Sequence, residues 1–122
     1  VQLFPNKTST AYLDRIFTWQ ESLERISKIA YSIKKLNISE GDRVAILAHN
    51  SDRYFEFLYS VSWAGAVFVP INTRLAPPEI EFWINDSESK LLFVDKNFAE
   101  VVTNLQKENK ISKILFKILY SK

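Results

Sequence analysis

The chain has 122 residues, enough for a single domain, and its 47% apolar and 25% charged residues are typical of a globular protein with a hydrophobic core. A net charge of only +2 argues against a dedicated nucleic-acid-binding protein. The absence of cysteine fits a cytoplasmic protein.

The longest uninterrupted apolar run covers residues 64–69, far fewer than the roughly 20 residues that a transmembrane helix needs. We therefore expect no transmembrane segment, and no signal peptide is visible at the start. The chain contains no methionine, even at position 1, so we expect a trimmed protein or a piece of a longer one. Spaced lysines near the end predict a solvated face: Lys107, Lys110, Lys113, Lys117 and Lys122.

Two short strands around a turn are predicted within the first 17 residues. Thr18 followed by Glu21 has the spacing of a capping box and predicts the start of a helix. Apolar residues then recur at three- and four-residue steps, which predicts an amphipathic helix that ends near Asn37 in a left-handed conformation.

A strand buried on both faces is predicted at residues 43–48, after a turn at Gly41. Asn50 or Ser51 can cap the next helix, which is apolar almost all round and is therefore expected to be deeply buried, with Trp63 in the core. Gly65 is expected to allow close packing of this helix on the sheet. The following run, residues 67–71, predicts a central strand ended by Pro70.

Pro77 and Pro78 suit the first turn of a third helix that ends near Asn85, and residues 90–95 predict a third buried strand. A fourth helix is predicted with Asn97 as its cap. Residues 111–120 have helical spacing, but a fourth parallel strand fits the topology better and is our prediction. The alternation predicts an α/β fold in which βαβ units build a parallel sheet with helices on both faces.

Residue counts exclude several common sites. Two glycines cannot form a dinucleotide fingerprint or a P-loop, and one histidine without cysteine cannot form a cysteine–histidine zinc site. A two-metal carboxylate site is compatible with the number of acids, but these are spread over helix surfaces. The missing cluster of acids after the strand at residues 43–48 also weakens a response-regulator receiver domain as an alternative.

Four side chains lie near predicted strand ends. His49 follows a strand, where α/β sheets bind ligands, but no Ser or Asp at a recognisable spacing supports it as an acid or base, so we interpret it as a loop residue. Asp42 precedes its strand, on the wrong side for a ligand. Asp95 follows its strand, and capping is its expected role; Asp52 also lies near a strand end.

The order of motifs resembles the N-terminal part of the adenylate-forming superfamily, the AMP-forming acyl-CoA synthetases and their relatives. "FTWQESLERI" resembles the first core motif of that family and "WAGAVFVPINTRL" its second, with "GDRVAIL" between them and "EIEFWINDSESKLLFVD" after them. The resemblance covers roughly residues 5 to 95. "PINTRL" followed by a Pro–Glu helix is closest to the fatty-acid and other acid–CoA ligases. Three positions depart from the family pattern: Ala76, His49 and Asn37 replace a capping Thr or Ser, a proline and a glycine.

The resemblance implies a full-length enzyme that uses ATP, Mg and CoA to join a carboxylic acid first to AMP and then to CoA. It also implies that the ATP phosphate loop, the magnesium ligand and the catalytic lysine of the family all come after this chain. We therefore expect residues 1–122 to be a partial N-terminal domain, inactive alone, and assign it no catalytic, cofactor-binding or metal-binding residue. By family analogy Asn72 and Arg74 lie near an acyl or CoA path, but loop capping explains both.

The expected partners are the remainder of the ligase domain, a carboxylic acid and CoA, and no nucleic acid. Without that remainder, the apolar stretch at residues 111–120 is expected to promote self-association. Two alternatives stay open: a non-catalytic, stand-alone α/β interaction module and the product of a truncated gene.

Overall fold

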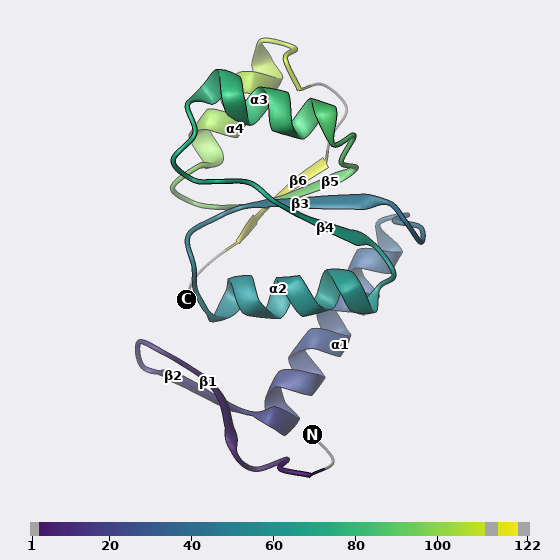
Figure 1. Cartoon of the computed structure of the whole chain (residues 1–122), viewed down its shortest axis with the longest axis vertical. Helices are drawn as coiled ribbons and strands as arrows, with labels where there is room; N and C mark the ends of the chain where they lie inside the picture. Colours follow the sequence, from purple (N-terminus) through teal and green to yellow (C-terminus); the bar gives the residue numbers. More distant parts are fainter. Residues whose placement is uncertain (1–2, 112–114, 120–122) are drawn as a thin grey trace.

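The computed structural model describes residues 3–111 and 115–119, and Figure 1 shows their arrangement. An antiparallel hairpin of β1 (Thr8–Tyr12) and β2 (Arg15–Thr18) leads into the long helix α1 (Trp19–Lys35). The elements that follow alternate between strand and helix: β3 (Arg43–Leu47), α2 (Asp52–Trp63), β4 (Val67–Pro70), α3 (Pro77–Asp86), β5 (Leu91–Asp95), α4 (Ala99–Lys107) and β6 (Leu115–Leu119).

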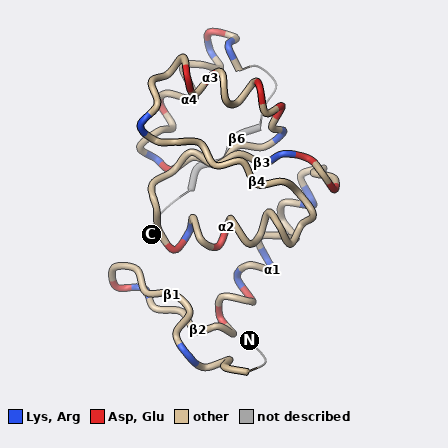
Figure 2. The backbone as a smooth tube through the Cα atoms, in the orientation of Figure 1, with Lys and Arg blue, Asp and Glu red and all other residues tan. Residues whose placement is uncertain are grey.

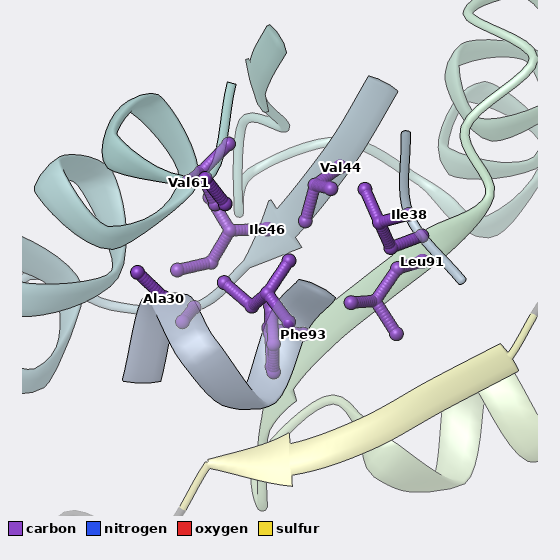
Figure 3. Close-up of a cluster of buried hydrophobic side chains, with 10 residues drawn as sticks. Ala30, Ile38, Val44, Ile46, Val61, Leu91 and Phe93 are labelled. Atoms are coloured by element: carbon purple, nitrogen blue, oxygen red, sulfur yellow. The ribbon is translucent and has the colours of Figure 1, made fainter. Parts of the chain in front are cut away.

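The four later strands form a parallel sheet in the order β4-β3-β5-β6. Helices α1 and α2 lie on one face of this sheet and α3 and α4 on the other, so the predicted α/β architecture is confirmed (Figure 1). The side chains of β3 alternate between two cores: Val44 and Ile46 pack toward α1 and α2, whereas Ala45 and Leu47 pack toward α3 and α4. Figure 3 shows the first core, in which Ile46 and Phe93 lie close to Ala30 and Val61.

The predicted boundaries of α1 are confirmed. The Thr18 hydroxyl accepts the Glu21 N–H at 3.2 Å, and the Glu21 carboxylate accepts the Thr18 N–H at 3.0 Å, which completes the capping box. Asn37 has a φ of 63°, the left-handed conformation expected after the helix. Because the capping box fixes the start of α1 directly after β2, the hairpin is joined to the helix without a linker.

The expectation of a deeply buried, all-round apolar α2 is wrong. The Trp63 side chain is 53% exposed, whereas Asp52, Glu56 and Ser60 are buried. These three residues recur every four positions and so share one face of the helix, which packs against α1 and the hairpin. A second side of α2, with Val61, faces the sheet. The remaining side, with Trp63, is therefore exposed to solvent.

Two further expectations around this helix need correction. Strand β4 lies at the edge of the described sheet, not in its centre, although Pro70 does end it as predicted. Gly65 does not serve close packing of helix on sheet, because the three atoms nearest to a Cβ placed there all belong to Glu40, which precedes β3, at 3.6–3.8 Å. Its φ of 83° is the reason for glycine at this position, since a side chain strains that conformation.

The later elements follow the predictions except at one cap. Pro77 and Pro78 begin α3, and Ala76 supplies no side-chain cap, as its replacement of Thr or Ser suggested. Asn97 does not cap α4: the helix follows Phe98, and the N–H of Asn97 instead bonds to the Asp95 carboxylate. Within the stretch 111–120, residues 115–119 form β6 as predicted, while 112–114 and 120 lie outside the described residues.

Candidate functional site

A small polar pocket lies at the carboxyl ends of β3 and β5, where open α/β sheets bind ligands. Its volume is about 170 Å³. The walls come from the loop after β3, the loop after β5 and the tip of the hairpin, and the lining residues are Tyr12, Ala48, His49, Asn50, Ser51, Arg53, Asp95, Lys96 and Asn97. The position is the one expected from the sequence, but the contribution of Tyr12 from the hairpin was not foreseen.

Asp95 connects the two loops of this carboxyl-edge pocket. One carboxylate oxygen accepts the backbone N–H of His49 at 2.8 Å, and the other accepts the N–H of Asn97 at 2.9 Å. Each oxygen therefore accepts one backbone N–H, and the carboxylate stabilises both loops. Asp95 thus caps backbone N–H groups, as expected, but those of the two loops and not those at the start of α4.

His49 is exposed, and its ring lies against Phe98, with 5.1 Å between the ring centroids. The nearby Asp95 carboxylate bonds to the backbone N–H of His49 and does not orient the imidazole ring. A general base needs such an orienting partner or a nucleophile within reach. The structure therefore agrees with the interpretation of His49 as a loop residue.

Asn72 and Arg74 lie in the loop between β4 and α3, and neither lines the carboxyl-edge pocket. The Asn72 side-chain oxygen accepts the N–H of Arg74 at 2.9 Å, which is the hydrogen bond of an Asx turn. Loop capping thus accounts for Asn72, as the sequence suggested.

Asp42 lies at the amino end of β3, away from the carboxyl edge, as predicted. Its carboxylate accepts the Ser39 N–H at 2.7 Å and lies 3.2 Å from the Lys90 ammonium group. The hydrogen bond from Ser39, helped by Lys90, lowers the pKa of Asp42 below its usual value. The group is therefore held ionised as part of a turn.

The buried charges on α2 are what the sequence reasoning missed. Glu56 is 2% exposed and pairs with Arg25 of α1 and with Arg53 of its own helix. Burial raises the pKa of Glu56, and the Arg25 hydrogen bond opposes that shift only in part. Figure 2 shows acidic and basic residues following one another along the N-terminal half of α2. The four-residue spacing of Asp52, Glu56 and Ser60 within an apolar helix was the available signal.

Asp52 has a different partner, Arg15 of β2, with Nε to Oδ2 at 2.9 Å and Nη2 to Oδ1 at 2.5 Å. The side chain of Asp52 is 1% exposed and that of Arg15 is 17% exposed. Asp52 therefore joins the hairpin to α2 and is not free to act on a ligand.

A second hollow, of about 420 Å³, lies between α1, α2 and β5. Its walls are mainly apolar, and its lining residues are Lys28, Ile29, Ser32, Ile33, Leu36, Phe57 and Phe93. A specific ligand site needs several polar groups that converge on one point, and here Lys28 and Ser32 both come from the same helix.

Three features bear on cofactor and membrane binding by the described residues: a metal-binding cluster, a pocket of the size of typical ligand sites and a helix able to span a membrane. Residues 3–111 and 115–119 contain no cluster of three or more His, Asp or Glu side chains suited to a metal ion. The carboxyl-edge pocket is smaller than the roughly 300–1,000 Å³ of typical ligand sites. None of the helices in the described ranges combines the length and the hydrophobicity that a membrane span requires.

Comparison with known proteins places this fold. The sequence matches the AMP-binding enzyme family over residues 1–120. It is 41% identical to the peroxisomal butyrate–CoA ligase of Arabidopsis thaliana over 101 residues, which are 83% of this chain and 18% of that enzyme. It is also 41% identical to the peroxisomal trans-cinnamate:CoA ligase of Petunia hybrida over 97 residues, 80% of this chain and 17% of the relative.

A solved structure gives the same result in three dimensions. The fatty acyl CoA synthetase of Mycobacterium tuberculosis superposes with a TM-score of 0.88 at 30% identity, covering 98% of this chain and 25% of that one. The chain thus spans less than a third of these proteins, and its parallel sheet and helices correspond to one part of their fold. By the family match over residues 1–120, this chain belongs to the AMP-binding enzyme family.

Proposed function

We propose that the chain is the N-terminal part of an ATP-dependent acid–CoA ligase. In this reaction a carboxylate attacks the α-phosphate of ATP to give an acyl adenylate and pyrophosphate, and the CoA thiol then displaces AMP to form the acyl-CoA thioester. The observation that carries the proposal is the family match over almost the whole chain, supported by curated relatives that are named as CoA ligases.

The substrate belongs to the same proposal. We expect a fatty acid, in line with the "PINTRL" resemblance and with similarity to a fatty acyl CoA synthetase and a butyrate–CoA ligase. The cinnamate ligase is an equally similar relative, so an aromatic acid is the alternative that the assay must include.

Within that enzyme, we propose that residues 1–122 are scaffold, that they end before the ATP phosphate loop, and that they contribute no catalytic, cofactor-binding or metal-binding side chain. The supporting role of Asp95, which binds backbone N–H groups of two loops, and the small volume of the carboxyl-edge pocket support this division. ATP, Mg and CoA would then be held by the remainder of the ligase. A cytoplasmic location completes the proposal, with the peroxisome as the alternative suggested by the names of two relatives.

The decisive experiment extends the coding sequence beyond Lys122 and assays the longest product. We expect a continuous reading frame whose protein releases pyrophosphate from ATP in the presence of Mg, CoA and one of three acids: butyrate, a long-chain fatty acid or cinnamate. A reading frame that stops at Lys122, or an extended protein inactive with every acid in a wider panel, would contradict the proposal.

The rival function is a stand-alone interaction module, for which a truncated gene is one possible origin. It is favoured by aromatic side chains that lie exposed on α2 and α3: Tyr59 at 51%, Trp63 at 53%, Phe82 at 58% and Trp83 at 46%. Later parts of a ligase domain would cover such surfaces equally well. A stop codon at Lys122 together with a stable monomer would support the module.

A further inference from the structure

The β1–β2 hairpin is attached to the rest of the domain although none of its own side chains is fully buried. No residue between 3 and 21 is buried, and Leu13 and Ile16 are 83% and 64% exposed. Figure 1 shows the hairpin on the far side of α2 from the sheet. Apolar contact is limited to partly buried residues such as Tyr12 and Phe17, whose ring centre lies 4.5 Å from the Arg25 guanidinium of α1, and polar contacts add to it.

The base of the hairpin is fixed to α1. The N–H groups of Trp19 and Gln20 donate to the carbonyls of Lys7 and Pro5, at 2.9 and 3.0 Å. The hydroxyl of Ser9 hydrogen-bonds to the buried hydroxyl of Ser22 in α1. These contacts all lie at the end of the hairpin next to the helix.

The tip is held by a different contact, the Arg15–Asp52 ion pair. The guanidinium group binds both carboxylate oxygens, a bidentate geometry that gives directional as well as electrostatic stabilisation. Because Asp52 is almost fully buried, loss of Arg15 would leave a desolvated carboxylate unpaired. Opening the hairpin would let water reach that carboxylate, so the ion pair and the position of the tip depend on each other.

Next to this ion pair, Tyr12 forms part of the carboxyl-edge pocket. The Arg15 guanidinium lies 5.4 Å from the centre of the Tyr12 ring, so the same group that binds Asp52 also lies over Tyr12. The same pocket is lined by His49, Asn50 and Ser51, from the loop that leads into α2.

We propose that the hairpin is a hinged wall of the carboxyl-edge pocket, closed by the Arg15–Asp52 ion pair and anchored at its base on α1. Breaking the pair releases the tip and opens the pocket on the Tyr12 side, while the sheet and its two cores stay folded. The proposal rests on the contacts of this chain alone and does not require the ligase activity.

Hydrogen exchange followed by NMR on the 122-residue chain tests the proposal. In Arg15→Gln, amides of residues 10–17 should lose protection by about tenfold or more, because a two-stranded hairpin freed from its tip contact is only marginally stable in water and its ladder frays. Amides of β3, β5 and the second half of α1 should keep their protection. The amide signals of His49, Asn50 and Ser51 should shift, because Tyr12, which lines the same pocket, has moved.

Two further variants make the result decisive. Arg43→Gln removes an exposed pair with Glu88 and should leave the hairpin protected. In the double variant Arg15→Gln with Asp52→Asn the buried charge is gone, so hairpin exchange should be slower than in Arg15→Gln alone. The proposal is overturned if hairpin exchange in Arg15→Gln matches the wild type. It is also overturned if protection falls equally in the hairpin and the sheet.

Discussion

The carboxylate of Asp95, at the end of β5, accepts the backbone N–H of His49, which follows the neighbouring strand β3. Its second oxygen accepts the N–H of Asn97, so one side chain fixes the two loops that form most of the carboxyl-edge pocket. The sequence predicts a capping role for Asp95, and in the structure its carboxylate supports the backbone of both loops around the pocket.

Replacement of Asp95 should therefore affect stability. We expect Asp95→Ala to lower the free energy of unfolding by about 1–3 kcal/mol, because two backbone N–H groups lose a charged acceptor. Asp95→Asn keeps one acceptor oxygen and should lie between alanine and the wild type. Urea denaturation measures both, and an asparagine variant that is less stable than the alanine variant would contradict this role.

The two sides of α2 should respond very differently to truncation. Val61 is 0% exposed and faces the sheet, so Val61→Ala should cost about 1–3 kcal/mol in unfolding free energy. Trp63 is 53% exposed, so Trp63→Ala should cost less than about 1 kcal/mol, although the apolar sequence around it predicts a core residue. Chemical denaturation of the pair checks the order, and a larger loss for Trp63 would mean that its indole is buried in solution.

Glu56 and Asp42 should give opposite pH dependences. Burial raises the pKa of Glu56 in the folded state, so its contribution to stability is present below the unfolded-state pKa and is lost as pH rises through the folded-state pKa. Hydrogen bonding lowers the pKa of Asp42, so its contribution is present above the unfolded-state pKa and is lost as pH falls through the folded-state pKa.

Unfolding free energies of Glu56→Gln and Asp42→Asn, measured against the wild type from acid to neutral pH, test both signs. As pH rises, Glu56→Gln should become more stable relative to the wild type, whereas Asp42→Asn should become less stable relative to it. If both stability differences changed with pH in the same direction, the environment described for either Glu56 or Asp42 would be wrong.

The 122-residue chain should neither bind ATP measurably nor form an acyl adenylate, because the nucleotide-binding motifs expected for the family lie after this part. Titration calorimetry with ATP and Mg, together with a pyrophosphate-release assay, measures both properties. Micromolar binding of ATP by this chain would place nucleotide contacts within residues 1–122 and refute the division of labour proposed above.

Self-association remains a prediction from the sequence. Strand β6 pairs only with β5 among the described strands, so its other edge has no described partner there, and the stretch 111–120 is rich in Ile, Leu and Phe. Sedimentation across a concentration series should show a rise in average mass. A monomer at high concentration would instead favour a self-contained domain.

Periodicity was sufficient to predict the elements that depend on local interactions. The capping box at Thr18, the left-handed Asn37 and the turn into β3 all involve residues within a few positions of one another, so the sequence shows them directly. The choice of strand for residues 115–119 came from topology, because their spacing alone favours a helix.

The burial of α2 and the pairing of its charges could not be predicted in this way. Hydrophobic pattern identifies α2 as a helix, but which side of it meets the sheet, α1 or solvent depends on where the hairpin and α1 pack. Arg15 and Asp52 are 37 positions apart, and nothing local in the sequence links them. The sequence by itself determined most of the succession of helices and strands, which follows from short-range pattern, and the family, which follows from the order of motifs along the chain. Only the tertiary structure decided that Asp52 and Glu56 are buried and Trp63 is exposed, because burial is set by contacts between distant segments.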